Sequence, residues 1–288
     1  YMPFYEVDSP AEILTQACAI LGQGQLSLAK FLFIADAGCW PDKHAAEHDL
    51  HAIRPFFAEV LRRADWTRDL HFHTQTTIDT LDYSGDSINA GSKVVVAAAG
   101  PPRFELAQEL TNQGGDLPDG FSDPHVVMPG VAAVRGPMLP DPSFDYDAVR
   151  RGQQSGEAME QQALAEAHSK APADIERLCR GLSLDHQLCR FRLIVVVDDP
   201  AFVATPAGAD SSGRINNWLW ATFTKANPAS DLWGVKPYTR RKHWGCLGPL
   251  VIDARTKPHH APAMEEDPQV TAKVEALAAA GGPLAGLF

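Results

Sequence analysis

The chain has 288 residues, of which 45% are hydrophobic and 21% charged, as in globular proteins that bury a sizeable core. Its net charge of −11 argues against a nucleic-acid-binding role, because phosphate binding depends on Lys and Arg. No apolar run approaches the roughly 20 residues needed to cross a bilayer, so we expect no association with a membrane.

Five cysteines are scattered along the chain, and none of them forms a C-x-x-C pair. An odd and widely spaced set argues against a disulfide framework and against a structural zinc knuckle. We therefore expect a cytoplasmic protein. The chain begins at Tyr1 rather than at Met, so we also expect it to be a piece of a longer protein.

Strand and helix patterns alternate in the first hundred residues. The apolar run from Lys30 to Asp36 predicts a strand buried on both faces of a parallel sheet. A helical stretch follows over about 42–63, interrupted at Pro55, which can begin a second helix. Residues 70–74 and 92–99 have the composition of further strands. This alternation predicts a layered α/β domain.

The middle of the chain has a different character. Residues 100–147 are rich in Pro and Gly, which predicts a long irregular excursion. It could be a flap or an arm that reaches a neighbouring subunit, and we favour an ordered insertion. Helices are expected over 147–169 and 172–182, so the insertion would extend to about 189. A last helix is expected over about 268–280, stopped by the Gly-Gly-Pro that follows.

A second apolar run, from Phe191 to Asp198, repeats the first at an offset of 162 residues. At the same offset Asp69 falls on Asp231, so both units have the same spacing between their two acids. We therefore predict two related β-loop-α-β units in one mostly parallel sheet, within a Rossmann-like three-layer domain that spans residues 1–288.

Residues 44–48 read HAAEH and fit the H-x-x-E-H pattern of inverted zinc peptidases, with His44, Glu47 and His48 as the metal-site residues. A catalytic zinc also needs a third protein ligand and a shaped cleft, and no third ligand stands out. On a helical wheel the histidines lie opposite an apolar stripe, so we expect them on the surface. The stripe is formed by Ala46, Leu50, Ile53 and Phe57.

Basic and histidine side chains gather near the end of the chain and could bind a carboxylate or phosphate, or line an interface. A solvated loop is an equal alternative. The candidate residues are Arg240, Arg241, Lys242, His243, Arg255, Lys257, His259 and His260.

Two acids, Asp36 and Asp198, close predicted strands at the edge where open α/β sheets usually bind ligands. Acids at that position also cap helices or fix loops, which is the interpretation we favour. The glycine motifs of dinucleotide-binding folds, P-loops and α/β-hydrolases do not occur, which argues against these three classes.

Several stretches resemble the C-terminal domain of the UbiD-like decarboxylases, which use prenylated FMN. The resemblance covers roughly residues 20–100 and 190–262. The matching stretches are residues 24–36, 77–83, 91–93, 216–228, 242–246, 248–255 and 257–261.

This resemblance implies a Rossmann-like domain that mediates dimerisation. In the complete family enzymes a separate split-barrel domain binds prenylated FMN through a metal-bridged phosphate and supplies one Arg and two Glu for catalysis. No stretch of this chain matches that catalytic domain, so we expect no catalytic, cofactor-binding or metal-binding residues here.

We therefore expect a dimerisation and active-site-wall domain of a non-oxidative (de)carboxylase that acts on an aromatic or α,β-unsaturated acid, in a homo-oligomer with its catalytic domain or subunit. One alternative is a stand-alone, non-enzymatic partner of a catalytic subunit. A lesser alternative is a zinc hydrolase that uses residues 44–48.

Overall fold

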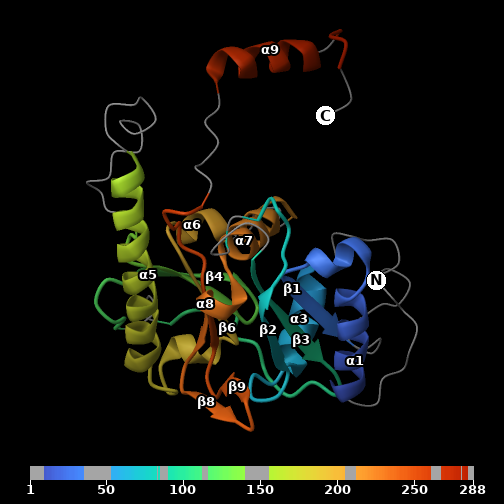
Figure 1. The fold of residues 1–288 in the computed structure, drawn as a ribbon, viewed down its shortest axis with the longest axis vertical. Helices are drawn as coiled ribbons and strands as arrows, with labels where there is room; N and C mark the ends of the chain where they lie inside the picture. The colour runs from blue at the N-terminus through green and yellow to red at the C-terminus, as the bar shows by residue number, and fades with distance from the viewer. Residues whose placement is uncertain are drawn as a thin grey trace.

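In the computed structural model, two larger β-sheets alternate with layers of helices, and a third sheet is a two-stranded hairpin (Figure 1). The described part of the chain comprises residues 10–35, 53–82, 84, 90–111, 116–139, 156–204, 212–260, 267–279 and 281–284. None of its helices is long and apolar enough to span a membrane.

The first sheet has three strands in the order β1-β3-β2, where β1 is parallel to β3 and β2 is antiparallel to β3. The helix α1 covers its outer face, since Ile13 and Ala17 pack against Val95 and Ala97. A short 3-10 helix, η1, leads from α1 to β1. The bounds are α1 Pro10–Leu21, η1 Gly24–Leu28, β1 Phe31–Ala35, β2 Leu70–Thr76 and β3 Gly91–Ala98.

The second sheet has five strands in the order β4-β5-β6-β10-β7. Its three inner strands are parallel to one another, and both edge strands are antiparallel to their neighbours. The helix α5 and the 3-10 helix η4 cover its outer face. The bounds are β4 Ser122–Met128, β5 Val131–Arg135, α5 Gly156–Gly181, η4 Gln187–Arg190, β6 Leu193–Val197, β7 Leu232–Gly234 and β10 Leu250–Asp253.

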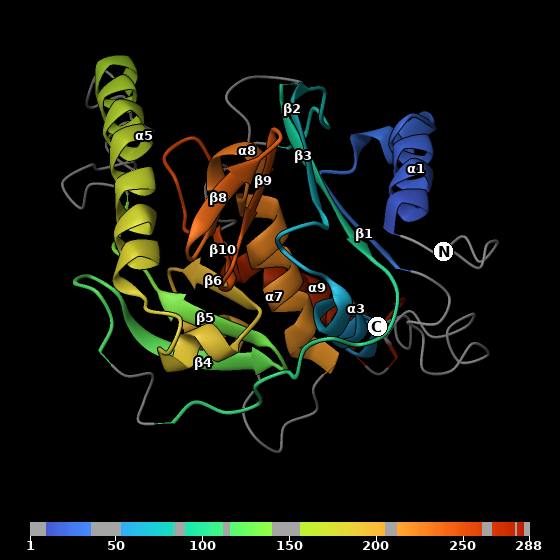
Figure 2. The same cartoon turned by 90° about the horizontal axis from the view of Figure 1, so that it is seen from below.

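Two helices lie between the sheets, α3 (Ile53–Arg63) and α7 (Ser212–Lys225), as Figure 2 shows from below. They meet through aromatic side chains, with the rings of Phe57 and Trp218 5.1 Å apart. The largest hydrophobic cluster is formed here from both helices and the inner faces of both sheets. Four smaller elements complete the body: α6 Pro200–Val203, α8 Pro228–Asp231, β8 Pro237–Arg240 and β9 His243–Cys246.

The structure supports the predicted repeat and extends it. The order α1-η1-β1-α3-β2-β3 recurs as α5-η4-β6-α7-β7-β10, with α6, α8 and the β8–β9 hairpin added in the second half. Strand β6 lies 162 residues after β1, and Pro10 at the start of α1 corresponds to Pro172 within α5. We call residues 10–98 the first repeat and residues 172–253 the second repeat.

The strand registers of the two repeats also agree. Phe31 pairs with Val94 as Leu193 pairs with Leu250, and Leu70 pairs with Val96 as Leu232 pairs with Ile252. The prediction that both units share one sheet was wrong, because each repeat builds its own sheet. The Rossmann-like, mostly parallel sheet is not confirmed, since both sheets are mixed. Strands β2 and β7 return beside β3 and β10 in antiparallel pairs, which need no crossover helix.

Part of the region predicted to be irregular forms the β4–β5 hairpin, so that prediction was wrong for these residues. Strand β5 pairs with β6, and four of its five residues are buried. The glycines on either side of β5 fit the turn and the packing of this hairpin. Gly130 turns the hairpin at a φ of 82°, and a Cβ at Gly136 would lie 2.5 Å from a Val196 methyl group.

Helices occur at the predicted places in the described residues, with some different boundaries, and the predicted parts over 42–52 and 147–155 lie outside the described residues. Residues 156–181 form one helix with Pro172 inside it, where two helices were expected. Pro55 lies in the first turn of α3, where a missing N–H costs little. The last helix, α9 (Pro268–Ala278), buries none of its residues and lies apart from the body in Figure 1.

Candidate functional site

The β8–β9 hairpin carries the densest group of cations in the chain. Arg240 pairs with His243 across the ladder, which leaves Arg241 and Lys242 as a two-residue turn. Both turn residues have positive φ angles, 51° and 65°, so both lie in the left-handed region. Turns of this kind favour Asn and Gly, because a side chain with a Cβ is strained there. The hairpin therefore presents two exposed cations on a strained backbone.

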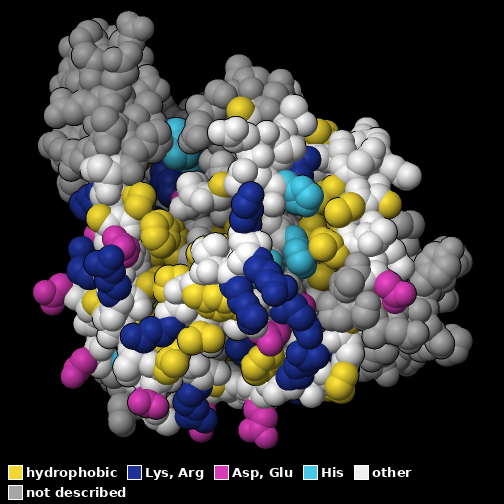
Figure 3. All heavy atoms as spheres, turned by 60° about the horizontal axis from the view of Figure 1, so that its bottom comes forward, with side chains coloured by type: hydrophobic (Ala, Val, Ile, Leu, Met, Phe, Trp, Pro, Cys, Tyr) yellow, Lys and Arg dark blue, Asp and Glu magenta, His cyan; other side chains and the backbone are white. Residues whose placement is uncertain are grey.

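This hairpin closes one side of a cavity of about 460 Å³. The other walls come from β2 in the first repeat and from α8 in the second repeat, so the cavity lies between the repeats. Figure 3 turns the lower face of Figure 1 forward and shows Lys and Arg side chains beside His side chains on it. The lining residues are Leu70, His71, Phe72, Thr74, Pro228, Ala229, Leu232, Arg241, Lys242, His243 and Trp244.

Two ring pairs join β2 to the hairpin at this cavity. The rings of His71 and His243 lie 5.5 Å apart, and those of Phe72 and Trp244 lie 5.6 Å apart. Burial lowers the pKa of His71 below its usual value, and the neighbouring His243 lowers it further. A neutral imidazole retains one N–H donor and one acceptor nitrogen. The cavity therefore combines cations, polar imidazoles and aromatic surface.

The predicted basic cluster does not form one group. Arg240 to His243 lie on the hairpin, whereas Arg255 is fully buried beyond the end of β10. Its guanidinium donates to both carboxylate oxygens of Asp253, at 2.8 and 2.7 Å, and pairs with Asp174 of α5 at 2.9 Å. Arg255 therefore fastens α5 to the sheet and is not available to a ligand.

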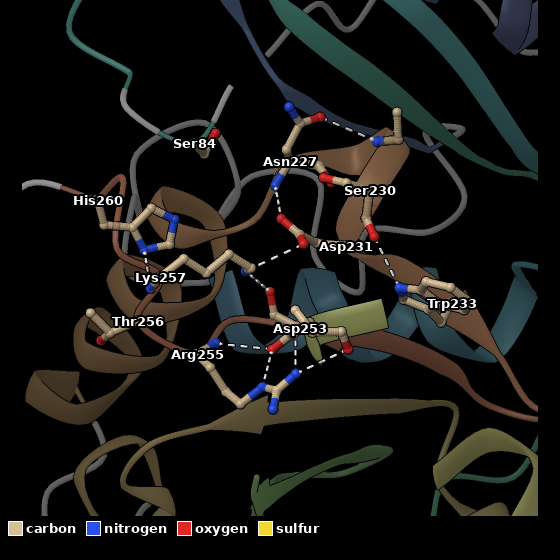
Figure 4. Close-up of polar contacts among 12 residues, drawn as sticks. Ser84, Asn227, Ser230, Asp231, Trp233, Asp253, Arg255, Thr256, Lys257 and His260 are labelled. Atoms are coloured by element: carbon tan, nitrogen blue, oxygen red, sulfur yellow. Dashed lines mark hydrogen bonds and ion pairs between the residues drawn. The ribbon is translucent and has the colours of Figure 1, made fainter. Parts of the chain in front are cut away.

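Lys257 of the predicted cluster lies in a buried charge network (Figure 4). The ammonium group of Lys257 lies 3.3 Å from the Asp231 carboxylate and donates to the Asp253 carbonyl at 3.1 Å. Burial raises the pKa of Asp231 to about 6, although Lys257 opposes this shift. Lys30, from the first repeat, is also buried and pairs with Asp82 at 2.8 Å.

His260 borders this network. Its Nδ1 atom accepts a hydrogen bond from the Lys257 backbone N–H at 3.1 Å, and its Nε2 atom is buried without a hydrogen bond to any described residue. Burial lowers the pKa of His260 to about 2, and Lys257, His259, Lys225 and Lys30 add to the effect. His260 is therefore a neutral, packed imidazole in the physiological pH range. Its neighbour His259 packs against it, with the rings 4.6 Å apart.

The strand-end acid Asp198 fixes a loop, as we favoured. Its Oδ2 atom accepts hydrogen bonds from the backbone N–H and the hydroxyl of Thr256, at 2.9 and 2.6 Å, and lies 3.3 Å from the Lys225 ammonium. These contacts join the carboxyl ends of β6 and β10. The other strand-end acid, Asp36, lies outside the described residues, as do His44, Glu47 and His48.

The described residues offer no group of three His, Cys, Asp or Glu side chains that could hold a metal ion. Burial raises the pKa of the Cys179 and Cys246 thiols to about 12, which makes them poor nucleophiles at neutral pH.

Sequence reasoning missed the half of the cavity that comes from the first repeat. His71 and Phe72 lie about 170 residues before the hairpin, and only the pairing of the repeats brings them together. The alternation of His71, Phe72 and His73 on one strand was the available signal, because it places two histidines on one face and an aromatic on the other.

Comparison with known proteins shows what the chain is similar to. Residues 5–98 match the family model of the 3-octaprenyl-4-hydroxybenzoate carboxy-lyase C-terminal domain (UbiD C-terminal domain). A Chlamydia pneumoniae protein, named as a subunit of 4-hydroxybenzoate decarboxylase, is 28% identical over 265 residues, which are 91% of this chain and 35% of that protein. An uncharacterized protein of Chlamydia trachomatis serovar D is 30% identical over 257 residues, 89% of this chain and 34% of that protein.

The chain spans about a third of the length of these curated relatives. The region matched by the family model contains the whole first repeat, from α1 to β3. The resemblance seen in the sequence is thereby confirmed, since residues 5–98 match the model of the UbiD C-terminal domain.

Proposed function

We propose that this chain is a non-catalytic part of a UbiD-like (de)carboxylase, where it joins subunits and forms one wall of the active site. The observation that carries the proposal is the similarity over 91% of the chain to a protein named as a 4-hydroxybenzoate decarboxylase subunit. The family-model match to the first repeat supports the same assignment. The substrate would be an aromatic or α,β-unsaturated carboxylic acid.

In this proposal the chemistry belongs to another part of the enzyme. About two thirds of the length of each relative lies outside the region matched by this chain, which leaves room for a catalytic part. Prenylated FMN and a divalent metal, which would supply the decarboxylation chemistry, would be held there. The described cysteines Cys18, Cys179, Cys189 and Cys246 are free thiols, which supports a reducing, cytoplasmic location.

The purified chain tests this assignment. We expect it to form a homo-oligomer in sedimentation analysis, to show no flavin absorbance band, and to release no CO₂ from 4-hydroxybenzoate. A chain that copurifies with flavin or decarboxylates the acid unaided would contradict a non-catalytic role. Co-expression with the catalytic part should give a stable complex that releases CO₂, and failure to form this complex would refute the proposal.

A second candidate is a stand-alone, non-enzymatic partner of a separate catalytic subunit, and the word "subunit" in the name of the Chlamydia pneumoniae relative favours it. The coding sequence upstream of Tyr1 separates the two candidates. An in-frame catalytic segment supports a domain of one long chain, whereas a start codon close to Tyr1 supports a separate subunit.

A further inference from the structure

The geometry points to a binding site for a small organic anion in the cavity between the two repeats. Arg241 and Lys242 hold its carboxylate or phosphate, and its flat apolar body lies against Phe72 and Trp244. The site is formed from residues of this chain alone, so it does not depend on the proposed decarboxylase role.

The backbone of the hairpin tip supports a functional role for the two cations. The left-handed region is strained for a residue that carries a Cβ, and both turn residues adopt it. Asn followed by Gly would form the same turn with less strain. The strain persists although Arg and Lys contribute no buried apolar surface at this exposed tip. Strained residues of this kind cluster at sites where the side chain has a task.

The described lining of the cavity carries cations but no acidic side chain. None of the lining residues is Asp or Glu, and Arg241 and Lys242 form no ion pair with any residue that the structure describes. The chain as a whole is acidic, with a net charge of −11, so this pair of exposed cations differs in sign from the average surface. The pair forms a local positive field that attracts anions.

The shape and the lining favour a small molecule over a flat protein surface. A cavity of about 460 Å³ is within the usual range for small-ligand pockets. Phe72 and Trp244 offer aromatic surface, and the imidazoles of His71 and His243 offer hydrogen bonds beside it. A ligand with an anionic group on a ring-sized apolar body could contact both the aromatic side chains and the polar, cationic side chains of the lining.

The difference between the repeats explains why space exists on this side. At the offset of 162, Pro228 and Ala229 of the lining correspond to Trp66 and Thr67. Trp66 is fully buried, and its Nε1–H donates to the Arg192 carbonyl at 2.8 Å. The second repeat therefore has two small residues where the first has an indole and a threonine, and the cavity lies against the small residues.

Isothermal titration calorimetry of the whole chain tests the site with three probes. Benzoate and phenyl phosphate carry an anionic group on a ring, and acetate has no ring. We expect the ring-bearing probes to bind with a dissociation constant of about 1 mM or below, and acetate to bind at least about tenfold more weakly. The tighter of the two ring-bearing probes identifies the preferred anionic group.

The informative variant is Arg241→Asn combined with Lys242→Gly. It removes both cations and relieves the turn strain, so its Tm should equal or exceed that of the parent chain while benzoate binding weakens by about tenfold or more. The matched control is Arg240→Ala, an exposed cation of the same hairpin that does not line the cavity, which should bind normally. Unchanged binding in the double variant, equal loss in the control, equal binding of acetate, or no binding of benzoate to the parent chain would each overturn the inference.

Discussion

Asp69 and Asp231 hold equivalent positions in the two repeats and make the same hydrogen bond. The Oδ2 atom of Asp69 accepts from the Asp65 backbone N–H at 2.8 Å, and that of Asp231 accepts from the Asn227 N–H at 2.7 Å. In both repeats this bond closes the turn that follows the central helix and leads into β2 or β7. The partners of the two carboxylates differ, because Asp69 pairs with the partly exposed Arg68 and Asp231 with the buried Lys257.

This difference predicts unequal costs for the same substitution. Asp69→Ala leaves one backbone N–H unpaired and should lower the free energy of unfolding by about 1–3 kcal/mol. Asp231→Ala also leaves the Lys257 ammonium buried without its carboxylate and should cost about 3–5 kcal/mol. Urea denaturation measures both, with Asp185→Ala at an exposed position as the control. Equal losses at Asp69 and Asp231 would contradict the assigned role of Lys257.

The repeat itself could be predicted from the sequence because it is carried by local features. Apolar runs that end in an acid, and a constant spacing to the next acid, marked β1 and β6 and the turns after α3 and α7. These features depend on burial and on hydrogen bonds between residues close in sequence. The number of sheets could not be predicted in this way, since it depends on which strands pair across long distances.

In the candidate site, too, local features could be predicted from the sequence and contacts between distant residues could not. The cations of the hairpin were found from composition, but their grouping with Arg255 and His260 was wrong because sequence proximity does not decide which face a side chain takes. Arg255 turns into the body towards Asp174, whereas Arg241 and Lys242 remain at the cavity. Strand β5 was missed because a five-residue run between two glycines is too short to show a period.

Arg255 provides a second stability prediction. Its guanidinium is fully buried and donates to Asp253, Asp174 and the carbonyls of Pro137 and Ala171. Arg255→Ala leaves two carboxylates buried without their cation and should cost about 3–5 kcal/mol. Arg255→Lys should recover only part of this loss, because a lysine ammonium cannot donate to both carboxylates in the planar geometry of a guanidinium. Thermal and urea denaturation measure the effect.

The control for Arg255 is Arg180→Ala, which removes an exposed arginine from α5, the helix that Arg255 fastens to the sheet. Arg180 pairs with Glu176 at the surface, so this variant should change the free energy of unfolding by about 0.5 kcal/mol or less. A comparable loss of unfolding free energy in the two variants would show that the stability depends on positive charge near α5 in general, and not on the buried contacts of Arg255.

The helix α9 should contribute little to the stability of the body. None of its residues is buried, and apolar burial is the main favourable contribution to folding. A chain that ends at His260 should therefore keep the midpoint of urea unfolding within about 0.3 M of that of the full chain. A larger fall would show that α9 packs on the body in solution, and hydrogen exchange of the α9 amides would report this contact directly.

The partly buried imidazole of His260 should make stability depend on pH with a definite sign. Its pKa is about 2 in the folded protein, because burial and the surrounding Lys257, His259, Lys225 and Lys30 disfavour the charged form. The unfolded chain titrates near the ordinary value of about 6.5, so below that pH the unfolded state binds a proton that the folded state does not. This group therefore stabilises the fold fully above about pH 6.5, and its contribution is lost as the pH falls.

Asp231 acts with the opposite sign, because its pKa is raised to about 6 in the folded protein. Its stabilising contribution is complete below the unfolded pKa of about 3.9 and is lost as the pH rises through about 6. The raw pH profile of the parent chain therefore mixes two opposing effects. A comparison with His260→Asn isolates the imidazole, since an Asn carbonyl oxygen can still accept from the Lys257 N–H and does not titrate.

At pH 7.5 the parent chain and His260→Asn should have similar free energies of unfolding. At pH 4.5 the variant should be the more stable by about 2 kcal/mol. In the parent, protonation of the His260 ring stabilises the unfolded state and not the folded state, and the variant has no ring to protonate. Urea denaturation at both pH values measures the difference, and NMR titration of the His260 ring reports its protonation in the folded state. A difference that stays constant between the two pH values would show that His260 is protonated in the folded protein and exposed to water.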